Sequence, residues 1–164
     1  MKVGLIISTY NWIEALNQVL ESIKLQTYLP DEIVVCDDGS SDDSGELVKN
    51  HQKDFPCILK HVWQEDYGFR VAAIRNKGIN ELSADIEYVV NIDGDMILHR
   101  KFIEDHIYFA KNNCFTQGSR VLISEEKTTQ LLSRGETNLI ISFFTTGIRK
   151  RKNTIYLRFF SSLL

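Results

Sequence analysis

The chain has 164 residues, of which 43% are hydrophobic and 25% are charged, and its formal net charge is −3. This length allows one domain with a buried core, which needs neither disulfides nor a structural metal. The negative net charge gives no reason to expect a nucleic acid as the partner, because proteins that bind nucleic acid through their net charge are basic. Cys36, Cys57 and Cys114 are widely spaced, so they match neither a disulfide framework nor a zinc site and are expected as free thiols in a reducing compartment.

β-rich runs alternate with helical stretches from the start of the chain. Residues 3–7 predict a strand, and a polar loop follows it. Asn11 and Glu14 resemble a capping box at the start of a helix that ends before Pro30. The same reasoning predicts strands at 32–36, 58–63, 88–92 and 116–123, and helices at 44–53, from 71, from 102 and from 125 to 132. This alternation indicates an α/β fold with a parallel, doubly wound sheet.

Two carboxylates one residue apart, Asp93 and Asp95, follow the strand predicted at 88–92. Gly94 between them allows a tight turn and the close approach of a ligand. Such hard oxygen donors suit Mg²⁺ or Mn²⁺, which complete their coordination with substrate phosphates and water. A metal and phosphate site is therefore predicted here, and a simple polar turn is the alternative, because Asp-Gly is a common turn dipeptide.

Two other predicted strands also end in polar loops, which should meet these carboxylates at one edge of the sheet. The ring of Tyr10 can stack on a base, and Asp38, which follows Asp37, can accept a hydrogen bond from the ring N–H of uracil. Arg70 and Arg75 can pair with phosphate oxygens. Together these side chains predict a nucleotide site. Individually, each has an ordinary alternative: packing for Tyr10, a turn or cap for the acids, and solvated helix charges for the arginines.

Four motifs in order resemble the family 2 inverting glycosyltransferases of the GT-A fold. They are Ser8-Thr9-Tyr10-Asn11, Val34-Val35-Cys36-Asp37-Asp38-Gly39-Ser40, Gln64-Glu65-Asp66-Tyr67-Gly68-Phe69-Arg70 with Arg75-Asn76-Lys77-Gly78, and Ile92-Asp93-Gly94-Asp95. The resemblance covers about residues 3 to 124. Residues 64–78 are similar to a segment in the glucuronosyltransferase half of bacterial chondroitin and hyaluronan polymerases, and in lipopolysaccharide and capsule enzymes.

The resemblance implies a Rossmann-like, mainly parallel sheet with helices on both faces. It also implies transfer of a sugar from a UDP-sugar to a hydroxyl of a glycan or glycolipid, with inversion at the anomeric carbon. Tyr10 and Asp38 would hold uracil, Asp93 the ribose or the metal, and Asp95 the Mn²⁺ or Mg²⁺ ion. The expected nucleotide-binding residues are Ser8, Tyr10, Asp37, Asp38, Asp66, Arg70, Arg75 and Asp93, and the expected metal ligands are Asp95 and Asp93.

The reaction also needs a general base, which takes the proton of the acceptor hydroxyl. Glu125, Glu126 and Glu136 do not match the acidic segment that carries the base in this family, so no base is assigned. We expect a nucleotide-sugar-binding core at 1–124 and an incomplete acceptor-side region at 125–164. The alternative is a binding module or inactive fragment without the base. A sugar nucleotidyltransferase is disfavoured, because the first loop has no glycine, and a phosphoacceptor receiver is disfavoured, because the acids lie in two loops.

The C-terminal region combines a basic run at 149–152 with apolar residues at 155–164. An interrupted domain, which would self-associate, is favoured over a segment that lies on an anionic membrane. The short apolar run at the N-terminus is neither a signal peptide nor a membrane span. We therefore expect a cytoplasmic protein, with peripheral contact at the inner face of the membrane as the further alternative.

Overall fold

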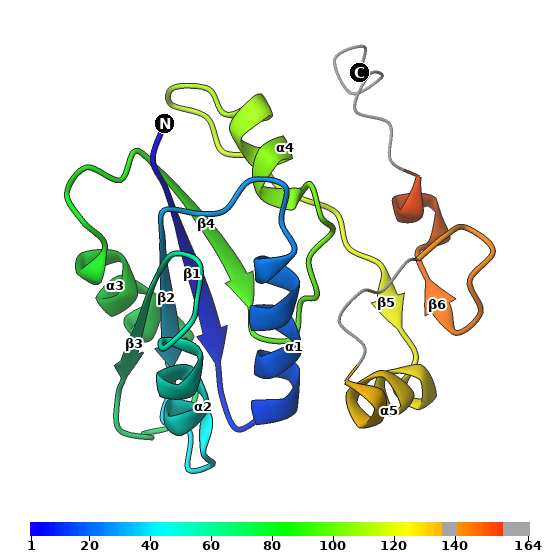
Figure 1. The fold of residues 1–164 in the computed structure, drawn as a ribbon, viewed down its shortest axis with the longest axis horizontal. Coiled ribbons are helices and arrows are strands. Elements are labelled where there is room, and N and C mark those ends of the chain that lie inside the picture. The colour runs from blue at the N-terminus through cyan, green and yellow to red at the C-terminus, as the bar shows by residue number, and fades with distance from the viewer. Residues whose placement is uncertain (136–140, 156–164) are drawn as a thin grey trace. The chain divides into compact units, whose positions relative to one another are not determined.

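The computed structural model describes residues 1–135 and 141–155, and the chain divides into two compact units, residues 1–108 and 109–164. In the first unit, four parallel strands form one sheet in the order β3-β2-β1-β4, and their arrows all point the same way (Figure 1). The strands are β1 (Val3–Thr9), β2 (Glu32–Asp37), β3 (Ile58–Trp63) and β4 (Tyr88–Asp93). The prediction of a parallel α/β sheet is confirmed.

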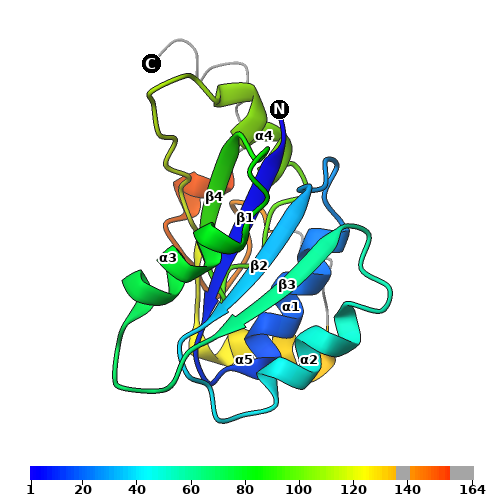
Figure 2. The same ribbon diagram turned by 90° about the vertical axis from the view of Figure 1, so that its left-hand side faces the viewer.

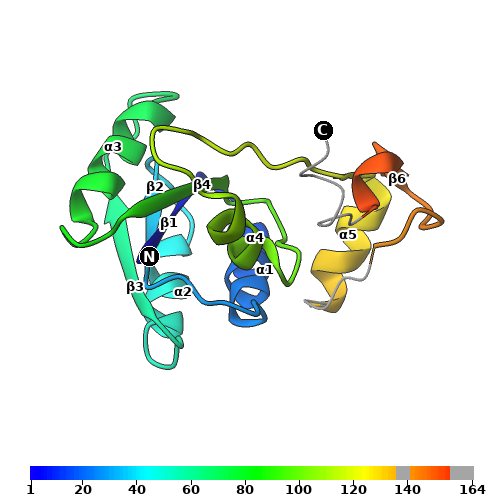
Figure 3. The same cartoon turned by 90° about the horizontal axis from the view of Figure 1, so that it is seen from above.

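Helices cover both faces of this sheet. Figure 2 and Figure 3 show α3 (Val71–Glu81) on the opposite face of the sheet from α1 (Ile13–Lys24), α2 (Ser44–His51) and α4 (Phe102–Phe109). Because β1 and β2 are central, every residue of both strands is buried, as expected for inner strands of a parallel sheet.

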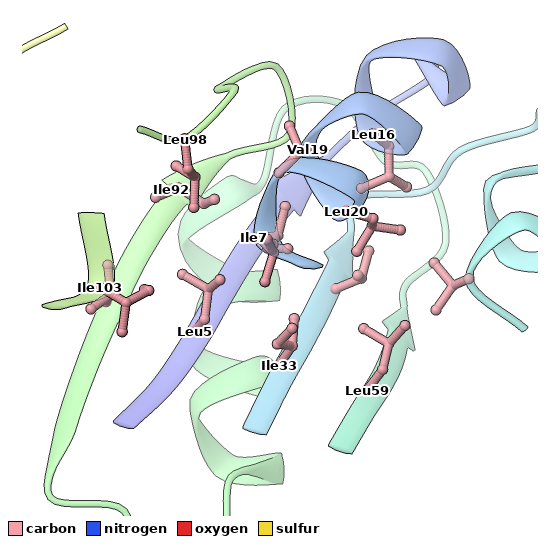
Figure 4. Close-up of a cluster of buried hydrophobic side chains, with 14 of the residues drawn as sticks. Leu5, Ile7, Leu16, Val19, Leu20, Ile33, Leu59, Ile92, Leu98 and Ile103 are labelled. Atoms are coloured by element: carbon pink, nitrogen blue, oxygen red, sulfur yellow. The ribbon is translucent and has the colours of Figure 1, made fainter. Parts of the chain in front are cut away.

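The alternation of side chains along the strands divides the core into two clusters. Leu5 and Ile7 of β1 point towards α1, where they pack with Leu16 and Leu20 (Figure 4). Ile6 points to the opposite face and packs in the cluster beneath α3. Both clusters have members that are wholly buried, so the sheet is held firmly from both sides.

Gly78 brings α3 close to the sheet. A Cβ atom at this position would overlap Sγ of Cys36 on β2, and it would also lie 3.4 Å from Cδ1 of Ile6. The same helix buries Ile74 completely. Because packing fixes Ile74 and Gly78 against the sheet, the backbone position of Arg75 between them is also fixed.

The second unit contains short elements. These are β5 (Leu122–Ile123), α5 (Glu125–Arg134), β6 (Ile148–Arg149) and a 3₁₀ helix at Arg151–Thr154, with β5 and β6 antiparallel. Ser124 caps α5 by accepting a hydrogen bond from the backbone N–H of Lys127, 3.4 Å away. The predicted strand at 116–123 is wrong for all but its last two residues, because only these find a pairing partner.

The predicted functional boundary at residue 124 falls inside the second unit and stays a prediction. The apolar end of the chain at 156–164 and the residues 136–140 lie outside the described residues. Within residues 1–135 and 141–155, no helix is both long and apolar enough to cross a membrane.

Candidate functional site

The parallel register brings the predicted site residues to one edge of the sheet. Ser8 near the end of β1 pairs with Asp93 at the end of β4, and Thr9 pairs with Asp37 at the end of β2. Asp37 in turn pairs with Trp63 at the end of β3. The loops that follow these strands therefore leave the sheet side by side, as the sequence analysis predicted.

Arg75 joins the ends of β1 and β4. Its Nη2 donates to Oδ1 of Asp93 at 2.6 Å and to Oγ of Ser8 at 2.8 Å, and its Nε lies 3.2 Å from the same hydroxyl oxygen. The side chains of Arg75 and Asp93 are 32% and 50% exposed. This ion pair is open to a ligand, and it places a guanidinium beside the carboxylate predicted to bind a metal.

Asp95 is presented to solvent by a tight turn. The backbone N–H of Gly94 donates to the carbonyl oxygen of Ser8 at 2.7 Å, and a Cβ at Gly94 would lie 3.0 Å from that oxygen. Asp95 itself is exposed and makes no hydrogen bond or ion pair with any described residue. Oδ2 of Asp93 likewise has no partner in the described part of the chain. Both carboxylates thus have oxygens available for a ligand.

The chemistry of these donors fits Mg²⁺ or Mn²⁺. Such ions use one or two protein carboxylates and take their remaining ligands from water and substrate phosphates. Across residues 1–135 and 141–155, no group of three or more His, Cys, Asp and Glu side chains could hold a metal by itself. A divalent ion at Asp93 and Asp95 would therefore take the rest of its coordination from water and from a phosphate-bearing ligand.

Asp38 connects the loop after β2 to the segment after β3. It is only 5% exposed, and its Oδ2 accepts from the backbone N–H of Arg70 at 2.9 Å. Its Oδ1 accepts from the side-chain amide of Gln64, which is also buried. A carboxylate offers about four lone pairs, so Asp38 keeps acceptor capacity for a ligand. Gln64 was not among the predicted site residues, although its place directly after β3 corresponds to that of Asp38 after β2.

Asp37 holds the first turn of the same loop from inside the protein. Its Oδ1 accepts from the backbone N–H of Ser40 at 2.7 Å, and its Oδ2 lies 3.3 Å from Nε2 of His61. Burial favours a higher pKa for Asp37, but the hydrogen bonds from His61 and Ser40 outweigh it and hold the pKa below the ordinary value. His61 was not among the predicted site residues, since nothing in a strand pattern identifies a partner on the neighbouring strand.

Tyr10 and Asp66 join the loops after β1 and β3. The hydroxyl group of Tyr10 donates to Oδ2 of Asp66 at 2.9 Å, and Oδ1 of Asp66 accepts from the backbone N–H of Gly68 at 2.9 Å. The bond to Asp66 raises the pKa of Tyr10, and the N–H of Gly68 lowers the pKa of Asp66. Tyr10 as a residue is 51% exposed, so its side chain is accessible to a ligand.

Gly39 allows these loops to meet. Its φ is +98°, which is a conformation that L-residues rarely adopt, and a Cβ there would lie 2.7 Å from Cα of Asp66. The predicted role of Asn11 as a helix cap is wrong, because α1 begins after Trp12 without a side-chain cap. Asn11 instead has φ 48°, and its Oδ1 accepts from the backbone N–H of Ser41 at 2.8 Å.

Arg70 is engaged within its own loop. Its Nη2 donates to the carbonyl oxygen of Glu65 at 2.6 Å, and its guanidinium lies over the ring of Tyr67, 5.1 Å from the centroid. Its Nε is buried without a hydrogen-bond partner among the described residues. The structure therefore distinguishes the two predicted phosphate partners, since Arg75 contacts Asp93 and Arg70 does not.

The chain is similar to known glycosyltransferases. The family model described as glycosyl transferase family 2 matches residues 5–164. Glycosyltransferase GlyA of Streptococcus pneumoniae is 38% identical over 103 residues, which are 63% of this chain and 14% of that protein. Chondroitin synthase of Escherichia coli is 30% identical over 142 residues, which are 84% of this chain and 20% of that protein. The chain thus spans a fifth or less of the length of these two relatives.

A solved structure shares the fold. The crystal structure of S. aureus TarS 1–349 in complex with UDP-GlcNAc superposes with a TM-score of 0.57 at 27% sequence identity. The match covers 66% of this chain and 31% of that one. Such structural neighbours are GT-A glycosyltransferases, so the predicted GT-A architecture is confirmed.

Proposed function

Because the chain belongs to glycosyl transferase family 2, we propose that it binds a UDP-sugar together with a divalent cation, as the donor site of an inverting hexosyl transfer. The observation that carries this proposal is the meeting of four strand ends at one edge of the sheet. That edge presents an exposed aromatic ring, a cation and two carboxylates with available oxygens, contributed by Tyr10, Arg75, Asp93 and Asp95. The complex of TarS with UDP-GlcNAc supports a nucleotide sugar as the kind of ligand.

The uracil base would bind where the loops after β1, β2 and β3 meet. Tyr10 would stack on the ring, and its bond to Asp66 would hold the aromatic side chain in place. The remaining lone pairs of Asp38 would accept the N3–H of uracil, while the bonds from Gln64 and Arg70 keep its carboxylate fixed. Asp37 would contribute by supporting the loop from inside.

The diphosphate would lie towards β4. Ser8 and Asp93 would be close to the ribose, and Arg75 would donate N–H groups to phosphate oxygens. Asp95 and Asp93 would hold Mn²⁺ or Mg²⁺, which supplies Lewis-acid stabilisation of the departing diphosphate. Arg70 would act on the phosphates only after leaving its contact with Glu65.

The acceptor in this proposal is a hydroxyl of a glycan or of a lipid-linked glycan. Inversion requires a general base on the opposite side of the anomeric carbon from the leaving diphosphate, and we assign that base to no described residue. Contact with a membrane surface and self-association through the C-terminal segment stay predictions. Hydrolysis or transfer of the donor, measured with and without a glycan acceptor, distinguishes a transferase from a pure binding module.

Calorimetric titration with UDP, in Mn²⁺ and in EDTA, tests the proposed site. We expect tighter binding in Mn²⁺ and a loss of most of that gain in Asp95→Ala. Asp54→Ala is the matched control, because Asp54 is 74% exposed and lies in the loop before β3, at the opposite edge of the sheet. CDP should bind about tenfold to a hundredfold more weakly, since cytosine presents an acceptor where uracil presents N3–H, so that two acceptors would face each other at Asp38. Equal metal dependence in wild type and Asp95→Ala, or equal affinity for CDP, would refute the assignment.

A further inference from the structure

The carboxylate of Asp93 already has a cationic partner supplied by the protein. Arg75 donates to its Oδ1 at 2.6 Å, and the same guanidinium contacts the hydroxyl of Ser8 on the neighbouring strand. Since Ser8 and Asp93 are register partners, one side chain spans the ends of both strands. Any metal ion that uses Asp93 must therefore share this carboxylate with a guanidinium.

This contact follows from how α3 is packed. Ile74 is wholly buried, and Gly78 lies so close to Cys36 that no side chain would fit. These two neighbours fix the helix against the sheet on either side of Arg75. The guanidinium thus cannot move far from Asp93 unless the side chain changes rotamer.

We propose that Arg75 is an internal counter-ion of Asp93 that makes cation affinity depend on the donor diphosphate. This inference rests on the proposed function. Two carboxylates and one guanidinium leave a single net negative charge, which attracts a divalent ion weakly, and the guanidinium also repels that ion. A bound diphosphate makes the site attract the divalent ion strongly, because it adds negative charge and accepts hydrogen bonds from the guanidinium.

Arg75→Met removes the charge and keeps most of the volume of the side chain. We expect this variant to bind Mn²⁺ without nucleotide roughly threefold to tenfold more tightly than wild type, because the competing cation is gone. It should bind UDP more weakly, and the factor by which Mn²⁺ strengthens UDP binding should fall. Arg75→Lys keeps a charge at this position, so it should retain low affinity for Mn²⁺ alone. A purely structural role of Arg75 would weaken both ligands together.

The experiment uses the full chain. Mn²⁺ binding without nucleotide is measured from the loss of the free-ion electron paramagnetic resonance signal, and UDP affinity is measured by calorimetry in EDTA and in saturating Mn²⁺. Lys77→Met is the matched control, since Lys77 is an exposed cation on the same helix and makes no contact with Asp93. In an Asp93→Asn background, the gain in Mn²⁺ affinity from Arg75→Met should be smaller than in wild type, because only the direct repulsion between the guanidinium and the ion is then relieved.

The inference is overturned if Arg75→Met binds Mn²⁺ no more tightly than wild type, or if Lys77→Met produces the same gain. Thermal unfolding is measured first to establish that the variants are folded, so that both results can be interpreted. Wild type that fails to bind UDP in the presence of Mn²⁺ would instead contradict the proposed function itself. If Arg75→Met binds UDP as wild type does, and Mn²⁺ strengthens that binding by the same factor, only the role given to Arg75 is contradicted.

Discussion

The hydroxyl group of Tyr10 lies 2.9 Å from Oδ2 of Asp66 and joins the loop after β1 to the loop after β3. This bond holds a half-exposed aromatic ring at the edge of the sheet where the other candidate residues meet. The ring and its hydroxyl group can therefore be tested separately, because one would contact the base and the other only orients the ring.

For Tyr10, we expect Tyr10→Phe to weaken UDP binding by about twofold to fivefold, which corresponds to one exposed hydrogen bond. Tyr10→Ala should cost about 1–3 kcal/mol, the range measured for stacking of a base on an aromatic ring. Calorimetry with UDP measures both values. Tyr28→Ala serves as control, since Tyr28 is exposed in the loop before β2, at the opposite edge of the sheet. Similar losses in Tyr10→Phe and Tyr10→Ala would contradict stacking.

For Gln64, we expect Gln64→Leu to lower the free energy of unfolding by about 1–3 kcal/mol, because the buried carboxylate of Asp38 loses a donor. UDP binding should weaken equally in Mn²⁺ and in EDTA, since this contact does not involve the metal. Urea denaturation and calorimetry provide the two measurements. Gln52→Leu is a suitable control, because Gln52 donates to the carbonyl oxygen of Leu59 near the start of β3, away from the carboxyl ends of the strands. A change in UDP binding confined to Mn²⁺ would contradict this role.

Gly78 and Gly45 form a pair for testing the packing of α3. Gly78→Ala should destabilise the protein by about 1–3 kcal/mol, because its Cβ would overlap Sγ of Cys36. Gly45→Ala should be neutral or stabilising by about 0.5–1 kcal/mol, since its Cβ has its nearest contact with His61 at 3.4 Å and alanine favours a helix. Urea denaturation of both variants measures the difference. Equal stabilities would show that α3 can shift away from the sheet at little cost.

We expect the stability of the protein to depend on pH through His51. It is buried between α1 and α2, with Nε2 2.9 Å from Oδ1 of Asn17, and burial together with the charge of Lys24 lowers its pKa. The unfolded chain then binds a proton more readily than the folded one, so this contribution to stability is present above about pH 6.5 and is lost as pH falls below it. Urea denaturation across pH 5 to 8 should show this slope in wild type and a smaller slope in His51→Gln. An unchanged slope in the variant would assign it to other groups.

The sequence by itself determined the order and type of the main elements. Alternating apolar runs and helical spacing predicted all four strands of the parallel sheet, and the strand at Ile58–Trp63 was predicted with its observed bounds. The strand-end rule also placed Asp38 and Asp93 at one edge of the sheet. These predictions succeeded because they depend on local periodicity and on the common direction of parallel strands.

Predictions failed where the outcome depended on a distant partner. Asn11 has the residue type of a helix cap, but the loop after β2 offers it Ser41 instead. The run at 116–123 has strand character, yet only Leu122–Ile123 finds a strand to pair with. Local propensity cannot decide such cases, because tertiary contacts supply the larger free energy.

Only the tertiary structure decided which side chains act together at the site. Gln64 reaches Asp38, and Arg75 reaches Asp93 and Ser8, across separations along the chain that no local pattern encodes. These contacts depend on the strand register and on the closeness of α3 to the sheet. The sequence thus shows which chemical groups are available at the sheet edge, while packing decides which charge meets which, because hydrogen bonds require positions accurate to a few tenths of an ångström.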